Sequence, residues 1–122
     1  MITVSYNGEH NTIIIEFEGA VDAVQAEQSF RDVEQVLSQC SPGFRVLTDL
    51  SSLKTMDIDV KGAVEKTTEL LKARGVMEIL RVIPDPAVDI GFNILSIFHY
   101  PREVTVLTLP SREEAQARWT VS

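Results

Sequence analysis

One stretch of the sequence is more informative than the rest: Phe44-Arg-Val-Leu-Thr-Asp-Leu-Ser-Ser-Leu-Lys-Thr-Met-Asp57. Its first part, Phe44 to Asp49, has the apolar and β-branched side chains of a buried strand. Its second part, Leu50 to Thr55, is polar enough to predict a bend. Met56 and Asp57 then stand just before an expected helix. The stretch therefore predicts a strand, a bend and a helix in close succession.

Two strands and a helix are expected before this stretch. Alternating or β-branched apolar side chains predict strands at Ile2 to Tyr6 and at Thr12 to Glu18. Asn7-Gly8 lies between them and predicts a turn with positive φ angles at these residues. From Asp22 to Gln39, apolar residues recur on one helical face, and Asp22 itself stands where a helix cap is expected.

The rest of the chain alternates between expected helices and strands. In order, these are a helix capped by Asp57 or Asp59 and ended by Gly75, a strand at Val76 to Ile83, a helix at Ala87 to His99, a strand at Glu103 to Leu109 and a helix at Ser111 to Trp119. The order ββαβαβαβα predicts one α/β domain over residues 1–122, with a five-stranded mixed sheet, an N-terminal β-hairpin and about four helices.

Composition excludes several classes of function. The formal net charge is −7, from 11 basic and 18 acidic residues, and no cluster of Lys and Arg interrupts it. Such a surface disfavours nucleic acids and acidic membranes. Two interpretations of the charge remain open: it favours a basic protein partner, or it only keeps the protein in solution. No run approaches the ~20 apolar residues of an integral membrane segment. The single cysteine, Cys40, and the lack of a signal-like N-terminus predict a cytoplasmic protein.

The segment from Val46 to Asp57 resembles the signature of the STAS domain (sulphate transporter and anti-sigma factor antagonist), also called the SpoIIAA-like fold. In that family a strand ending in Asp-Leu-Ser, here Asp49-Leu-Ser51, leads to an Asp-Ser pair at a helix start. The end of the chain, Glu103 to Trp119, is also similar to the close of bacterial SpoIIAA-like proteins. The resemblance implies a single SpoIIAA-like domain that serves as a non-catalytic interaction or regulatory module.

The chain departs from the family pattern at the phosphorylated serine, because Asp57 is followed by Ile58. Ile58 has no hydroxyl, and Thr55 is the best substitute acceptor nearby. Two interpretations of the acidic residues remain open: they only cap the helix, or they act as a fixed negative charge at the switch. By the resemblance, we predict the partner-binding residues to be Thr55, Asp57, Ile58 and Asp59.

No local pattern predicts catalysis, a metal or a cofactor. His10 and His99 each lack a second ligand at helical spacing. Glu16 and Glu18 are two residues apart on one strand, which is typical of the solvated side of a half-buried strand. The glycines are scattered and form no phosphate-binding loop. We therefore expect no enzyme activity, although a site assembled from distant residues leaves no local pattern.

The expected helix at residues 87–99 has too many apolar side chains for one buried stripe. Three outcomes remain open: neighbouring elements cover it, it forms a homodimer or partner interface, or it lines a pocket for a lipid-like ligand. The last is the alternative function, and it rests on a similarity in fold to CRAL-TRIO modules. The residues concerned are Ile90, Phe92, Ile97, Phe98 and Tyr100.

Overall fold

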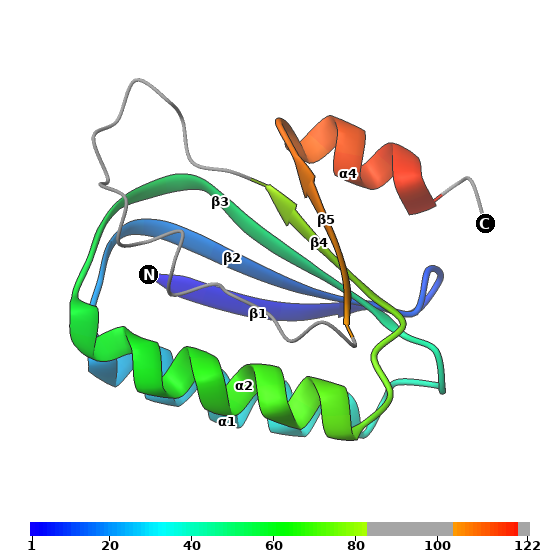
Figure 1. Ribbon diagram of the computed structural model, residues 1–122, viewed down its shortest axis with the longest axis horizontal. Coiled ribbons are helices and arrows are strands. Elements are labelled where there is room, and N and C mark those ends of the chain that lie inside the picture. The colour runs from blue at the N-terminus through cyan, green and yellow to red at the C-terminus, as the bar shows by residue number, and fades with distance from the viewer. Residues whose placement is uncertain (83–103, 120–122) are drawn as a thin grey trace.

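The computed structural model describes residues 1–82 and 104–119, which form a five-stranded sheet with helices on both faces (Figure 1). The strands are β1 (Ile2–Asn7), β2 (Thr12–Val21), β3 (Arg45–Met56), β4 (Glu78–Val82) and β5 (Thr105–Leu109). The helices are α1 (Ala23–Leu37), the short 3-10 helix η1 (Ile58–Val60), α2 (Lys61–Ala73) and α4 (Arg112–Trp119).

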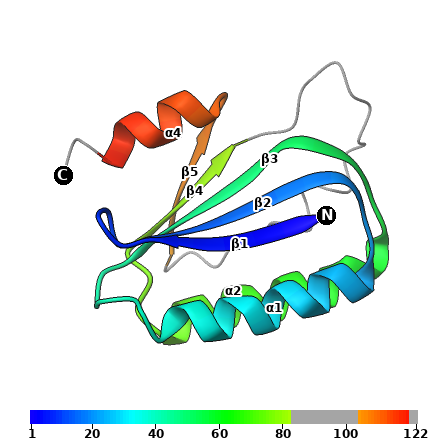
Figure 2. The same cartoon turned by 180° about the vertical axis from the view of Figure 1, so that it is seen from behind.

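The strands lie in the sheet in their sequence order. β1 pairs with β2 antiparallel, and all other neighbours are parallel, so the predicted mixed sheet with an N-terminal hairpin is confirmed. Helices α1 and α2 cover one face and α4 lies on the other, as both views show (Figures 1 and 2). The expected helix at 87–99 and its residues Ile90, Phe92, Ile97, Phe98 and Tyr100 lie outside the described part of the chain.

The main core lies between the sheet and the helices α1 and α2. Alternate residues of β2 and β3 point into it because side chains alternate between the faces of a strand. The helices contribute one stripe each, through residues such as Val33 and Leu71. Its fully or almost fully buried members include Ile13, Phe17, Val33, Phe44, Val46, Leu50, Leu53, Val60 and Ile79.

The prediction of a bend at Leu50 to Thr55 is wrong, because β3 continues as a strand to Met56. It keeps pairing with β2, which itself runs on to Val21. Two irregularities in the pairing register, and Gly19 at φ 65°, accommodate the extra length. The polar residues that suggested a bend are interrupted by Leu50 and Leu53. Both leucines are buried, as expected of a strand that still packs on the core.

The positive φ angle of the hairpin is not where the sequence placed it. Asn11, with φ 49°, adopts the left-handed conformation, and neither Asn7 nor Gly8 does. The hydroxyl of Tyr6 donates a hydrogen bond to Oδ1 of Asn11 at 2.7 Å and so stabilises the longer loop. At the end of α2, Gly75 has φ 85° and its N–H donates to the Lys72 carbonyl, which confirms its predicted role.

Candidate functional site

The predicted partner-binding residues lie together at the junction between β3 and α2. Thr55, Asp57 and Asp59 are exposed, and Ile58 keeps 61% of its surface in contact with solvent. The N–H of Asp57 donates to the Val21 carbonyl at 3.1 Å, which fixes the junction to the end of β2. Most of the Ile58 side chain is therefore accessible for contact with another molecule.

The predicted helix cap at this junction is wrong. Neither Asp57 nor Asp59 caps α2: its N-cap residue is Val60, and no side chain makes a capping hydrogen bond there. The one-turn helix η1 is the reason, because its own carbonyls at Asp57 and Ile58 accept the N–H groups of Val60 and Lys61. Both carboxylates therefore project from a helix start without being used in a cap.

A further exposed apolar residue stands at the same end of the molecule. Helices α1 and α2 begin side by side at this end (Figures 1 and 2), and Val24, in the first turn of α1, is 77% exposed. Sequence analysis missed Val24 because it lies outside the apolar stripe of α1, which was the only signal available. We call Thr55, Asp57, Ile58 and Asp59 the helix-start surface. Val24 lies apart from it and lines a groove with Met1, Ile2 and Gln28.

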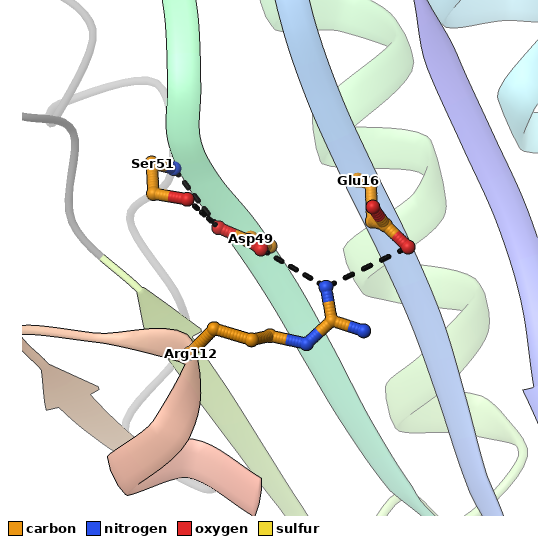
Figure 3. A network of polar contacts seen from close by, with 4 residues as sticks. All are labelled: Glu16, Asp49, Ser51 and Arg112. Atoms are coloured by element: carbon orange, nitrogen blue, oxygen red, sulfur yellow. Dashed lines mark hydrogen bonds and ion pairs between the residues drawn. The ribbon is translucent and has the colours of Figure 1, made fainter.

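A second group of polar residues lies on the opposite face of the sheet, where Arg112 of α4 reaches two carboxylates (Figure 3). Its Nη1 donates to Oδ2 of Asp49 at 3.0 Å and lies 3.6 Å from Oε1 of Glu16. The other carboxylate oxygen of Asp49 accepts hydrogen bonds from Oγ and N–H of Ser51, at 2.6 and 2.9 Å. Asp49 is almost fully buried, and these hydrogen bonds and the ion pair with Arg112 stabilise its negative charge.

These contacts set the protonation state of Asp49. Burial by itself raises the pKa of this carboxyl group, but the hydrogen bonds from Ser51 and the charge of Arg112 outweigh it. The net pKa of Asp49 is therefore below the ordinary value of 3.8. Asp49 consequently stays ionised and serves as a fixed anchor for α4.

A third polar group occupies the other end of the same face. Glu78 is almost fully buried and forms ion pairs with Nε of Arg45 at 3.2 Å and with Nη2 of Arg118 at 3.4 Å. Neither network leaves a local pattern in the sequence, and Glu16 was expected on the solvated side of β2. That prediction suits Glu18, which is exposed, but Glu16 pairs with Arg112.

The part of the chain that the structure describes has a small cavity and a larger, more open groove. The groove, of about 300 Å³, is lined by Met1, Ile2, Val24 and Gln28 among others. A cavity of about 30 Å³ lies between the sheet and the helices α1 and α2, lined by Phe17, Val33 and Thr68 among others. That volume corresponds to about one water molecule, whereas ligand pockets span about 300–1,000 Å³. Within residues 1–82 and 104–119, no group of three His, Cys, Asp or Glu side chains is placed to hold a metal ion.

A search for membrane-spanning helices gives no candidate in the described ranges, because each helix there is too short or too polar. No protein-family model matches the sequence, and no curated protein matches it significantly.

Solved structures do match. The anti-sigma factor antagonist SpoIIAA in its unphosphorylated form is 17% identical, with a TM-score of 0.67 over 97% of this chain and 96% of that one. RsbS from Moorella thermoacetica, with a serine-to-glutamate substitution, is 11% identical, with a TM-score of 0.65 over 98% and 95%.

An uncharacterised Shewanella loihica protein with a SpoIIAA-like fold is 12% identical, with a TM-score of 0.59 over 98% of this chain and 92% of that one. Identities this low establish the architecture alone. The predicted resemblance is confirmed at that level: this protein has the STAS, or SpoIIAA-like, fold.

Proposed function

We propose that this protein is a non-catalytic interaction or regulatory module that binds a protein partner through the helix-start surface. The observation that carries the proposal is the exposure of Ile58 between two carboxylates that make no capping bond. An exposed apolar side chain next to carboxylates that make no capping bond has the composition of a small protein-binding patch. The proposal treats residues 1–122 as one module acting in the cytoplasm.

The charges of this surface indicate what kind of partner it would accept. Asp57 and Asp59 lie at the start of a helix, where the dipole favours negative charge. The chain as a whole carries a formal net charge of −7. A partner segment with an apolar residue flanked by Lys or Arg would therefore match Ile58 and its neighbours.

The route of regulation is proposed to differ from that of the structural neighbours. SpoIIAA occurs in phosphorylated and unphosphorylated forms, and in this chain Ile58 follows Asp57 and offers no hydroxyl. We propose that the two carboxylates act as a permanent negative charge at this position. Thr55 is exposed and is the residue to examine for phosphate by mass spectrometry of the protein from its own cells.

The alternative of an apolar-ligand carrier draws little support from the described residues. The cavity between the sheet and the helices α1 and α2 holds about 30 Å³, and the open groove beside Met1 and Val24, of about 300 Å³, is at the lower end of ligand-pocket volumes. The residues first expected to line such a pocket lie outside those ranges. A homodimer remains part of the proposal as one form of protein partner, and light scattering of the purified chain measures it directly.

Affinity capture at native expression level tests the proposal. Wild type is compared with Ile58→Glu and with Glu69→Gln, a matched control at an exposed carboxylate farther along α2. We expect one set of proteins to be recovered with wild type and with the control, but not with Ile58→Glu. Recovery of the same proteins with all three would contradict the proposal.

A further inference from the structure

The face of the sheet under α4 is organised in rows. Parallel register places residues of neighbouring strands side by side, so that each row crosses the sheet. From the beginnings of the parallel strands to their ends, the rows are Thr12–Arg45–Glu78–Thr105, Ile14–Leu47–Leu80–Leu107 and Glu16–Asp49–Val82–Leu109. An apolar middle row thus lies between two rows that contain buried carboxylates.

Helix α4 matches these rows with three residues on one of its faces. Arg112, Ala115 and Arg118 are spaced by three, which places them along the same side of a helix. Arg112 pairs with Asp49 and Glu16 of the last row, and Arg118 pairs with Glu78 of the first. Ala115 is completely buried and packs with Ile14, Leu47 and Leu80.

Most of the described side chains of α4 are exposed. Ala115 is the buried one, whereas Glu113, Glu114, Gln116, Ala117 and Arg118 are exposed. A helix of eight residues does not persist alone in water, so its order depends on these contacts. The sheet, by contrast, has its larger core on the other face, with α1 and α2.

We propose that α4 is a detachable cap that opens while the rest of the sheet stays folded. Arg112 and Arg118 act as two clamps, and release of both uncovers the apolar middle row, with Ile14, Leu47 and Leu80. This creates a second surface, on the opposite face from α1 and α2, whose exposure is controlled by α4. The inference is independent of the proposed helix-start surface, because it involves none of those residues.

Native-state hydrogen exchange tests the opening on the wild-type chain. We expect the amides of α4 to exchange at least about tenfold faster than those of Val46 and Leu47 in β3, with a smaller dependence on denaturant. Equal rates and equal denaturant dependence would overturn the proposal, because α4 would then open only in global unfolding.

Thiol labelling provides an independent measurement. In a Cys40→Ser background, Ala115→Cys places a thiol under α4, and Ala26→Cys places one in the core under α1. We expect labelling at position 115 to be at least about tenfold faster than at position 26. Similar rates at the two positions would contradict a detachable cap.

The clamps are tested by adding Arg112→Gln and Arg118→Gln to the Ala115→Cys chain. Loss of the three partly exposed ion pairs of Arg112 and Arg118 should accelerate labelling at position 115 by about 5–30-fold. Arg81→Gln is the control, because Arg81 donates to Thr108 of β5, whereas the ion pairs of α4 are made by Arg112 and Arg118. An unchanged rate in the double Gln variant, or an equal acceleration by Arg81→Gln, would overturn the role of the clamps.

Discussion

Arg112 and Asp49 are 63 positions apart in the sequence, yet Nη1 of one donates to Oδ2 of the other at 3.0 Å. The contact joins the last described helix to the strand that carries the family-like Asp-Leu-Ser segment. In this chain Asp49 therefore has a structural role that its place in that segment does not reveal: it anchors α4 to the sheet.

The lowered pKa of Asp49 predicts how stability depends on pH. Since its pKa is lower in the folded chain than the ordinary 3.8, its ionised form stabilises the fold above that pH. This contribution is lost as pH falls through the folded-state pKa. Asp49→Asn should therefore cost about 1.5–3 kcal/mol at pH 7, the value of hydrogen bonds to a charged group, and progressively less below pH 3.8.

Urea unfolding of wild type and Asp49→Asn across pH 2–7 measures this difference. Glu69→Gln, which removes an exposed carboxylate from α2, controls for the change in net charge. A gap between wild type and Asp49→Asn that is constant over the whole pH range would contradict the account.

The buried pair of Arg45 and Glu78 should be costly to break. Their side chains are only 14% and 8% exposed, so Glu78→Leu leaves the arginine charge without a partner in a poorly solvated position. We expect a loss of about 3 kcal/mol in the free energy of unfolding. The double variant, Arg45→Met with Glu78→Leu, should lose less free energy of unfolding than Glu78→Leu alone. If chemical denaturation shows that the losses of the two single variants simply add, the two residues are not coupled.

Asp22 and Asp57 should differ in their effect on stability, although each precedes a helix. Asp22 and Gln25 form a complete capping box, in which Oδ1 of Asp22 accepts from the Gln25 N–H at 2.9 Å. Asp57 makes no capping hydrogen bond. Asp22→Ala should therefore cost about 1 kcal/mol and Asp57→Ala less than about 0.5 kcal/mol in thermal or urea unfolding. Equal losses would show that Asp57 caps its helix in solution.

Most of the fold could be predicted from the sequence, because its strands and helices carry regular apolar patterns. The capping function of Asp22 and the end of α2 at Gly75 could also be predicted from the sequence, since both depend on local chemistry. The continuation of β3 past Leu50 could not be predicted. It depends on pairing with β2, and no local pattern reports the register of a distant strand.

The candidate site was predictable only in part. Thr55, Asp57, Ile58 and Asp59 are neighbours in the chain, so the sequence could group them, but their exposure depends on how η1 starts α2. Arg112, Glu16 and Asp49 come from three separate elements. Only the folded sheet brings them together, so no spacing along the chain could have indicated the network.

The central claim is that Asp59 and Ile58 bind a protein partner and are not needed for folding. The most direct test is the dissociation constant of a partner obtained by affinity capture, measured by titration calorimetry with wild type, Asp59→Asn, Ile58→Glu and the Glu69→Gln control. We expect both helix-start variants to weaken binding at least about fivefold and to keep unfolding free energies within about 1 kcal/mol of wild type, whereas the Glu69→Gln control should bind like wild type. Wild-type affinity in both variants would contradict it.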